Sequence, residues 1–515
     1  MVAMFRISAI LVLAALLFIA VMRLLFPLPS LEGRQPSSAI PAGDDTALNR
    51  NIQPVVVSEP GKSGILPLFE GTDAFSARML LARSAQTSID AQYYIWQNDL
   101  TGIPLLNELR IAAERGVRVR LLVDDNGTPD LDAELAALNA LPTAEVRVFN
   151  PFNLRNPRLL SYLFDFFRLN RRMHNKSFTV DGTATIIGGR NIGDIYFARD
   201  AETQYSDLDL LAVGQVVPDV AAEFDLYWNS QSAYPHELLV DPPADGLAVL
   251  DRRQEEVKAD PGTDDYVAAL QDSTIVRNLA AGTLALHWAE TQLVADDPAK
   301  GLGKIADNRL MITQLAKILG TVRSGLDLIS AYFVPGDRGV DALAAAVAGG
   351  AKVRTLTNSL DATDVLPVHA SYAKYRRKLL AAGVSVFELK SHPTPRMAED
   401  DLRLFGGSAS SLHAKTLILD NDRVFVGSFN FDPRSVFLNC EMGFLVRSPE
   451  LAAQVSQSFQ QMISEESWQV TRDDSGGLRW TDVATGSVET TEPGSSAVRT
   501  FMLMVLGWLP VEWLM

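Results

Sequence analysis

The chain contains a single cysteine, Cys440, and only six histidines among its 515 residues. One cysteine excludes an intrachain disulfide and any zinc site built on several thiolates. Basic residues are also scarce, because 46 Lys and Arg stand against 62 Asp and Glu, for a formal net charge of −16. A strongly acidic chain is poorly suited to phosphate backbones, so we expect no nucleic-acid partner. No HExxH-like spacing occurs, and we expect neither a metal nor another cofactor.

Charged residues are absent between Ile7 and Met22, and the apolar character continues past Arg23 to Leu28. Such a run approaches the ~20 residues that span a bilayer. A cleaved signal peptide is the competing interpretation, since Arg6 precedes the run. No small-x-small cleavage site follows, so we favour an uncleaved anchor. Arginines at both ends leave its orientation undetermined.

The rest of the chain repeats itself at a nearly constant separation. Four ordered matches indicate two copies of one domain, and alternating strand-like and helical stretches within each copy predict an α/β fold. The first three matches are TSIDAQYYIW (87–96) with SGLDLISAYFV (324–334), ERGVRVRLLVDD (114–125) with AGGAKVRTLTNS (348–359), and AEVRVFN (144–150) with AGVSVFE (382–388).

The predicted organisation places these two domains behind the anchor. We expect the apolar end of the chain to dock onto the body rather than to cross a membrane, because its unbroken apolar run is too short. The expected segments are an anchor (1–28), a flexible linker (29–64), domain 1 (65–240), a linker (241–264), domain 2 (265–470), and a linker with an apolar tail (471–515).

The fourth match contains residues that can take part in catalysis. RRMHNKSFTVDGTATIIGGRN (171–191) and SLHAKTLILDNDRVFVGSFN (411–430) both contain His-x-Lys, four residues, Asp, six residues, Gly, and Asn three places further on. Asp181-Gly182 predicts a tight hairpin turn, so His174 and Lys176 should lie on one face of the strand before it. His413 and Lys415 should do the same before the second turn.

A cleft that joins both His-Lys pairs would suit a phosphodiester. Lys176, Lys415, Asn191 and Asn430 would bind the phosphate oxygens and stabilise developing negative charge. One histidine would attack phosphorus to form a phosphohistidine, while the other would protonate the departing alcohol.

Each histidine also needs a partner that fixes its tautomer. We expect Asp207 and Glu441, each downstream of the histidine of its own half, with Asp209 and then Glu202 as alternatives to Asp207. Structural roles are expected for the turn residues Asp181 and Asp420, and for Gly188, Gly189 and Gly427, which permit close backbone approach.

Taken together, these motifs resemble the phospholipase D superfamily, and within it the bacterial cardiolipin synthases, most closely their C type. The resemblance covers nearly all of residues 65–470. It rests on the doubled motif together with YYIWQNDLTG (93–102), LNRRMHNKSFTVDG (169–182), GGRNIGDIYF (188–197), AYFVPGD (331–337), TNSLDATD (357–364) and NFDPRSVFLNCEMG (430–443).

The resemblance implies two tandem phospholipase D-like α/β/α domains that form a pseudo-twofold pair. It implies transfer of a phosphatidyl group from phosphatidylglycerol or phosphatidylethanolamine to phosphatidylglycerol, at the bacterial inner membrane. His174 would be the nucleophile and His413 the acid/base, with Asp207 and Glu441 orienting them and the lysines and asparagines binding phosphate. It names no protein partner. Several family members have two N-terminal spans, whereas one is visible here.

Other functions remain open at this point. A phospholipase D that hydrolyses phospholipids to phosphatidic acid would use the same groups, since only exclusion of water differs. A nuclease of the same superfamily and a non-catalytic lipid-binding scaffold are the remaining alternatives. The basic, aromatic segment 153–172 before His174 could insert among lipids and attract anionic head groups, or pack against the core.

Overall fold

The described part of the chain is built on one continuous β-sheet. The computed structural model describes residues 2–199, 204–281, 283–391, 410–509 and 512–515. The first half contributes, in order of pairing, β9 (Ala233–Pro235), β4 (Ala144–Phe149), β3 (Arg118–Asp124), β2 (Ser88–Tyr93), β5 (Ser177–Val180), β6 (Ala184–Gly188), β8 (Asp209–Gly214) and β1 (Ser63–Leu68).

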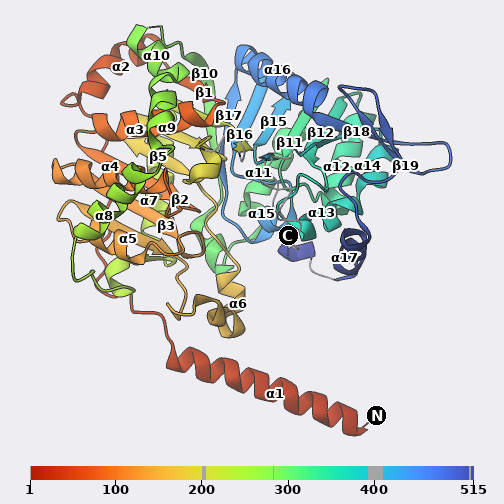
Figure 1. Cartoon of the computed structure of the whole chain (residues 1–515), viewed down its shortest axis with the longest axis horizontal. Helices are drawn as coiled ribbons and strands as arrows, with labels where there is room; N and C mark the ends of the chain where they lie inside the picture. The colour runs from red at the N-terminus through yellow and green to blue at the C-terminus, as the bar shows by residue number, and fades with distance from the viewer. Residues whose placement is uncertain (1, 200–203, 282, 392–409, 510–511) are drawn as a thin grey trace.

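The second half continues the same sheet. Its strands are β10 (His287–Ala295), β17 (Met442–Arg447), β16 (Arg423–Gly427), β15 (Lys415–Leu419), β11 (Gly325–Ser330), β12 (Lys352–Asn358), β13 (Ser385–Leu389), β18 (Ser467–Arg472), β19 (Leu478–Asp482) and β20 (Val488–Glu489). Antiparallel pairing of β1 with β10 joins the halves, with Ser63 opposite Ala289 and Ile65 opposite His287. Figure 1 shows the two halves side by side.

The two halves repeat one topology. In each, three parallel strands are followed by an antiparallel hairpin: β2, β3 and β4 precede the β5–β6 hairpin, and β11, β12 and β13 precede the β15–β16 hairpin. The hairpins lie where the sequence predicts them, around Asp181-Gly182 and Asp420-Asn421. These turn residues all have positive φ, between 52° and 60°. The fold class is therefore α/β with two related domains, as predicted.

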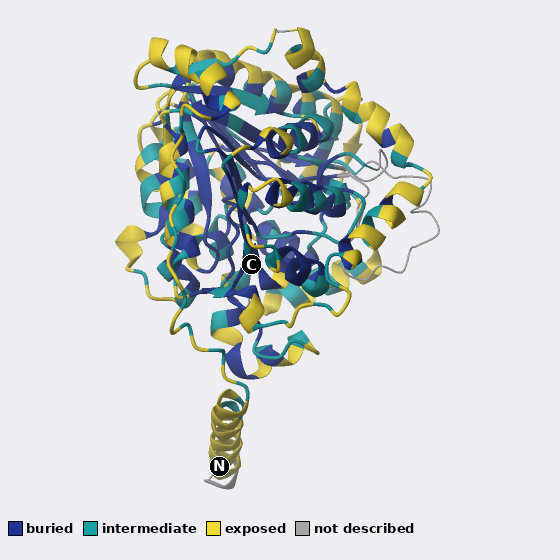
Figure 2. Cartoon of the chain, turned by 90° about the vertical axis from the view of Figure 1, so that its left-hand side faces the viewer, coloured by how far each residue is buried: buried dark blue, intermediate teal, exposed yellow. Residues whose placement is uncertain are grey.

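The sheet is buried because helices cover it. Val119, Leu121 and Val123 on β3 have no exposed surface, as is usual for parallel strands with both faces covered. Figure 2 shows this buried centre beneath partly exposed helices. The first half is covered by α3 (Gly71–Ser84), α4 (Gly102–Glu114), α5 (Asp132–Asn139), α7 (Val217–Trp228), α8 (Ala248–Ala259), α9 (Thr263–Gln271) and α10 (Thr274–Ala281).

The second half has its own set of helices. α16 packs against strands of the hairpin and of the outer sheet, and buries Leu451, Val455 and Phe459. The set comprises α11 (Met311–Leu319), α12 (Gly336–Ala348), α13 (Leu366–Ala373), α14 (Arg376–Ala381), α15 (Pro433–Phe437) and α16 (Pro449–Glu466).

The segment 29–64, expected as a flexible linker, lies as a strap along domain 1. The Arg34 guanidinium donates to three carbonyl oxygens, those of Asn229 and Ser230 at 2.7 Å and that of Ala233 at 2.6 Å. The segment also contains α2 (Ala47–Ser58) and the start of β1. Pro, Ser and Gly content indicated flexibility, but it does not reveal hydrogen bonds to a distant surface.

The segment 241–264, expected as a linker, is largely helical. α8 and α9 occupy most of it, and Leu250 is fully buried against the first domain. The packing of α8 on the first domain could not be predicted from its charged sequence, because only a few apolar residues make the contact.

The C-terminal segment docks onto domain 2. β18, β19 and β20 extend the sheet, and α17 (Ala497–Trp508) packs on α13. The carbonyl oxygen of Met515 accepts from Arg434 N at 2.7 Å. Docking agrees with the expectation for the tail, although α17 leaves Phe501 and Trp508 exposed.

The N-terminal helix α1 (Val2–Leu25) projects from the body, as Figures 1 and 2 show. Within the described ranges, its stretch Phe5–Leu25 is the one helix long and apolar enough to cross a membrane, with a mean hydropathy of 2.6 and no part buried. Arg23 ties its end to α6 (Tyr162–Leu169), donating to Phe164 O at 2.9 Å and pairing with Asp165 at 3.0 Å.

Candidate active site

Each His-x-Lys histidine lies just before its hairpin rather than on the strand itself. β5 begins at Ser177 and β15 at Lys415, so both histidines belong to the segments that lead into the sheet. The reason is that these segments pair across the molecule instead. The His174 amide donates to Cys440 O at 2.8 Å, and the His413 amide donates to Ser206 O at 2.9 Å.

The two cross-connections are alike. Met173 and Cys440 form a parallel bridge, while β14 (Ser410–Leu412) runs parallel to β7 (Gln204–Ser206). Each histidine segment therefore lies beside the stretch of the other half that carries an acidic residue. This brings all four side chains, two histidines and two carboxylates, to the junction of the domains.

The carboxylates pair crosswise with the histidines. His174 Nδ1 lies 2.8 Å from Glu441 Oε2, and His413 Nδ1 lies 2.5 Å from Asp207 Oδ2. All four side chains are buried. Sequence order had placed each carboxylate downstream of the histidine of its own half, but the structure gives it the histidine of the other half. A carboxylate at Nδ1 leaves Nε2 of each ring available for chemistry.

Glu441 is itself held by two serines that sequence reasoning missed. Ser428 Oγ donates to Glu441 Oε2 at 2.5 Å, and Ser435 Oγ donates to Oε1 at 2.9 Å. Ser428 belongs to the GSFN motif and Ser435 to the quoted stretch NFDPRSVFLNCEMG, so both lay within an available signal. Fixing both carboxylate oxygens restricts the orientation of the His174 ring.

Electrostatics keep the imidazoles neutral and the acids ionised. Burial lowers the pKa of His174 to about 4, opposed by Glu441, with Lys176 and Lys415 lowering it further. Burial, followed by the Lys415 charge, lowers the pKa of His413 to about 3. Burial raises the pKa of Glu441, but its contacts with His174 and Lys176 outweigh that effect and leave its pKa below the usual value. The same balance with His413 holds the pKa of Asp207 well below its ordinary range.

The two lysines share this site without a carboxylate partner. Lys176 Nζ donates to His174 O at 2.5 Å, and Lys415 Nζ donates to His413 O and lies 3.0 Å from its Nδ1. Burial lowers the pKa of Lys176 to about 7 and that of Lys415 to about 8. In the described part of the chain neither ammonium forms an ion pair, so a bound phosphate anion would favour the charged form of both.

Comparison with known proteins identifies the family of this chain. The family described as "Cardiolipin synthase, PLD-like domain" matches the chain twice, over residues 80–228 and 315–463. Cardiolipin synthase C of Escherichia coli (strain K12) is 45% identical over 466 residues, which cover 90% of this chain and 98% of the relative. The chain belongs to the phospholipase D-like cardiolipin synthase family. It is thus an enzyme of the phospholipase D superfamily.

More distant relatives agree with this family. A cardiolipin synthase of Staphylococcus aureus (strain Mu50) is 27% identical over 391 residues, covering 76% of this chain and 65% of the relative. The crystal structure of phosphatidylserine synthase from Haemophilus influenzae Rd KW20 has a TM-score of 0.53 at 14% identity, covering 82% of this chain and 92% of that one. The second likeness concerns the fold alone.

The two family asparagines differ in their surroundings. Asn191 Oδ1 accepts from Ile95 N at 3.1 Å, and its Nδ2 donates to Tyr196 OH at 3.0 Å. Asn430 Oδ1 is buried with no hydrogen-bond partner among the described residues. Asn191 therefore keeps one N–H for a ligand, and Asn430 is the less committed of the two.

The alternatives to Asp207 lie elsewhere. Asp209 forms a buried ion pair with Arg78 at 2.8 Å and accepts from Arg190 N at 3.2 Å, so it supports the core rather than a histidine. Glu202 lies outside the described residues.

The motif aspartates hold backbone rather than substrate. Asp181 accepts from the amides of Gln86, Thr87 and Ser88 at 2.8–3.1 Å, at the start of β2. Asp420 accepts in the same way from the amides of residues 323–325 at the start of β11. Each aspartate thus joins its hairpin turn to the neighbouring strand, in addition to occupying the turn.

The motif glycines stand where a side chain would collide. A Cβ at Gly188 would lie 2.1 Å from Asp209 Oδ1, and one at Gly427 would lie 2.3 Å from Met442 O. At Gly189 it would lie 2.1 Å from Asp207 Oδ1, the carboxylate that contacts His413.

Tyrosines surround both rings, and sequence reasoning did not assign them. Tyr94 contacts His174 edge-on, with ring centroids 5.1 Å apart. Tyr205 stacks on His413 at 5.1 Å and 12°, and Tyr196 contacts the same ring edge-on at 5.2 Å. Tyr94 and Tyr196 lie within the quoted family motifs, which was the available signal. Tyr205 precedes Asp207 by two residues.

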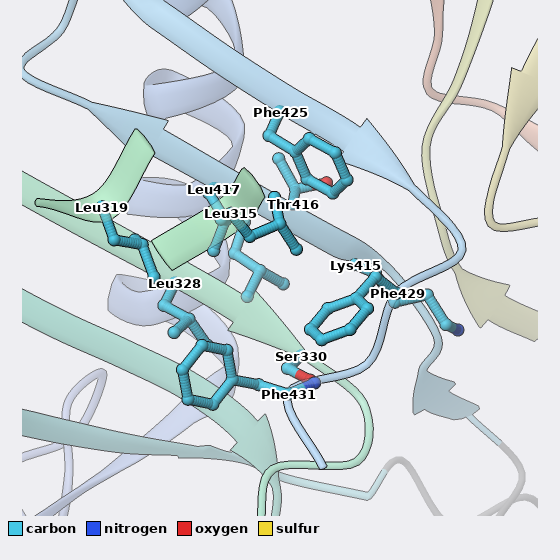
Figure 3. Close-up of a pocket in the computed structure, with 11 residues that line it drawn as sticks. Leu315, Leu319, Leu328, Ser330, Lys415, Thr416, Leu417, Phe425, Phe429 and Phe431 are labelled. Atoms are coloured by element: carbon cyan, nitrogen blue, oxygen red, sulfur yellow. The ribbon is translucent and has the colours of Figure 1, made fainter. Parts of the chain in front are cut away.

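A small cavity lies beneath the Lys415 end of the site, as Figure 3 shows. It is lined mainly by apolar side chains between α11 and the sheet, including Leu315, Leu328, Phe425 and Phe429. Its volume of about 10 Å³ admits at most a single water molecule, so it is part of the packing behind the site and not a lipid-binding pocket.

The structure bears on the two roles left open for the basic segment 153–172. Four of its five arginines are held in ion pairs by the protein's own carboxylates and are not available to attract anionic head groups. Its apolar side chains are nevertheless exposed, Leu159 by 73%, Leu163 by 61% and Phe167 by 67%. The ion pairs are Arg155–Asp125 at 2.6 Å, Arg158–Asp132 at 2.7 Å, Arg168–Asp165 at 2.6 Å and Arg172–Asp124 at 2.5 Å.

Proposed function

We propose that this chain is a cardiolipin synthase that moves a phosphatidyl group from phosphatidylglycerol or phosphatidylethanolamine to phosphatidylglycerol through a phosphohistidine. The observation that carries the proposal is the crossed pair of buried His–carboxylate contacts, with two buried lysines beside them, in a chain of this family. Two imidazoles with available Nε2 atoms supply a nucleophile and an acid/base for a phosphodiester.

In the first step, His174 Nε2 attacks phosphorus. The new P–N bond replaces the P–O bond to the head group of the donor lipid, and protonated His413 transfers its proton to the departing alcohol oxygen. His413 is neutral in the resting site, but the phosphate anion between the imidazoles would raise its pKa. Lys176 and Lys415, with Asn191 and Asn430, stabilise the charge on the non-bridging oxygens.

In the second step, neutral His413 accepts the proton of the primary hydroxyl of phosphatidylglycerol. That oxygen bonds to phosphorus, the P–N bond breaks, and His174 returns to its starting form. Water in place of the lipid alcohol would give phosphatidic acid, so the position of the site relative to lipid decides the outcome.

The membrane position of the protein supports the synthase alternative. We infer a single N-terminal anchor in the inner membrane of a bacterium, formed by Phe5–Leu25. Its end contacts α6, whose exposed Leu163 and Phe167 would lie in the interface. Tyr162 of α6 lies 3.4 Å from Asn126, and Asn126 in turn donates to Tyr94, which contacts His174. The bilayer would therefore lie close to the nucleophile.

The deciding experiment uses the purified full chain in mixed micelles of phosphatidylglycerol, with and without phosphatidylethanolamine. We expect cardiolipin by mass spectrometry, an acid-labile phosphoenzyme in quenched samples, and loss of both in His174→Ala. His287→Ala is the matched control, since His287 lies on β10 away from the site. Phosphatidic acid as the sole lipid product would assign a hydrolase, and DNA cleavage that is lost in His174→Ala would assign a nuclease.

A further inference from the structure

The carboxyl ends of β11 and β12 hold a group that the mechanism above does not use. Tyr332 follows β11 and Asp364 follows β12, and Tyr332 OH donates to Asp364 Oδ2 at 2.8 Å. Tyr205 OH, from the other half, donates to the same oxygen at 3.2 Å. Ligands of open α/β sheets bind outside the carboxyl ends of parallel strands.

The second oxygen of this carboxylate is unsatisfied. Asp364 Oδ1 is buried and has no hydrogen-bond partner among the residues that the structure describes. Buried acceptors without a partner are rare, and a ligand hydrogen is one explanation for them. Because both tyrosines already donate to Oδ2, the carboxylate is fixed in place, and any group that meets Oδ1 must be a hydrogen-bond donor.

This carboxylate stands on the His413 side of the site. The Tyr205 ring that contacts it stacks on His413, and its charge acts on Lys415, raising the pKa that burial lowers. Three tyrosine rings, Tyr196, Tyr205 and Tyr332, accompany it, and aromatic faces beside a carboxylate favour a cation.

The matching position of the first half is neutral. Tyr94 corresponds to Tyr332 in the internal repeat, but its hydroxyl contacts the amide of Asn126 at 3.2 Å instead of a carboxylate. The two sides of the site therefore differ in charge. The His174 side offers a neutral amide, and the His413 side offers a carboxylate.

We propose that Asp364, fixed by Tyr332 and Tyr205, is the head-group selectivity residue of the enzyme, binding the ammonium or hydroxyl group that lies beyond the reacting oxygen. The proposal rests on the proposed function, in which every alcohol that leaves or enters does so at His413. One site would then receive first the donor's head group and later the acceptor's glycerol. The shared chemistry is a hydrogen-bond donor about two carbons from the reacting oxygen.

In the test, the full-length enzyme is incubated in phosphatidylglycerol micelles with three small alcohols of equal size at equal concentration. Ethanolamine carries an ammonium, ethylene glycol a hydroxyl, and 1-propanol neither. Mass spectrometry of the three phosphatidyl products gives their ratios. We expect the unmodified enzyme to favour ethanolamine or ethylene glycol over 1-propanol by about tenfold or more, as a hydrogen bond to a charged group allows. The preferred one identifies the group that Asp364 binds.

Asp364→Ala should bring these ratios close to one, and Asp364→Asn should lose the ammonium preference more than the hydroxyl preference. Asn126→Ala is the matched control and should keep the ratios of the unmodified enzyme. If Asp364→Ala does not fold, Asp364→Asn and Tyr332→Phe provide the same readout. Unchanged ratios in folded, active Asp364 variants would overturn this inference and leave the proposed function standing. An unmodified enzyme that forms neither cardiolipin nor any phosphatidyl alcohol would instead remove the proposed function.

Discussion

At the scale of single residues, the site depends on an absent side chain as much as on those present. Gly189 has no Cβ, and one built there would lie 2.1 Å from Asp207 Oδ1. The carboxylate can therefore reach His413 Nδ1 at 2.5 Å. Any larger residue at 189 would displace Asp207 and leave His413 without its partner. The motif glycine thus acts on the chemistry through the position of the acid.

Deprotonation of the two buried lysines should lower the activity of the enzyme as pH rises. The pKa values of Lys176 and Lys415 are lowered to about 7 and about 8, so both ammonium groups lose their protons as pH rises through that range. We expect kcat/KM, measured as cardiolipin formation against pH, to fall from about pH 7 upward. The value of kcat should begin to fall at a higher pH than kcat/KM, because bound phosphate favours the charged form of the lysines.

Arginine variants provide the control for this pH profile. Lys176→Arg and Lys415→Arg lower overall activity through their size, but the guanidinium keeps its charge across the range. In at least one of the two variants, the alkaline fall of kcat/KM should shift to higher pH. A fall that stays in place in both variants would show that neither lysine is responsible for it.

At the scale of elements, the hairpins could be predicted from sequence and their partners could not. Alternating apolar residues around Asp181-Gly182 are a local signal, and β5 and β6 form where that signal lies. The contact of His174 with Glu441 joins residues far apart in the chain, through a bridge between Met173 and Cys440. No local pattern encodes such a pairing. The strap 29–64 and the ion-paired arginines of the segment 153–172 were missed for the same reason.

The exposed face of α6 should bind lipid through its apolar side chains. Leu163→Glu combined with Phe167→Glu places charge where the interface would lie, so we expect weaker binding to phosphatidylglycerol vesicles and at least several-fold lower cardiolipin formation. Flotation of the purified chain with vesicles measures the binding. Raising the salt concentration should have little effect, because four of the five arginines in the segment 153–172 are already paired with carboxylates of the protein.

Val267→Glu serves as the comparison for this variant. Val267 is 43% exposed on α9, and α9 lies in the upper part of the body in Figure 1, whereas α1 projects from the bottom. The Val267→Glu variant should float with vesicles as the unmodified chain does. Equal flotation of the α6 variant and this control would place the membrane contact elsewhere.

At the scale of the whole molecule, the two domains form one unit. β1 and β10 carry the sheet across the domain boundary, and the carboxylates cross it in both directions at the site. A substitution in one half should therefore disable the histidine of the other half. Variants of the two carboxylates should also fail in different steps, because in the proposed mechanism they orient histidines with different roles.

A phosphodiester with p-nitrophenol as its leaving group separates these steps, since this alcohol needs little help from an acid. Asp207→Asn should still release a burst of p-nitrophenol and then turn over about 10²–10⁴-fold more slowly, because His413 cannot act well as the base. Glu441→Gln should lose the burst as well, because His174 loses its orientation. Rapid-quench measurement of p-nitrophenol release follows the burst and the later turnover in both variants. Bursts of equal size in the two variants would contradict the assigned roles.

The crossed pairing also bears on how such a chain could have arisen. A single copy of the repeated unit holds an imidazole and an acid that cannot satisfy each other, so an unfused ancestor would have needed two molecules related by a twofold axis. Once the copies were joined, neither could be lost or drift alone, because each supplies what the other lacks. The two sides of the shared centre have nevertheless diverged, because one now carries Asn126 and the other Asp364.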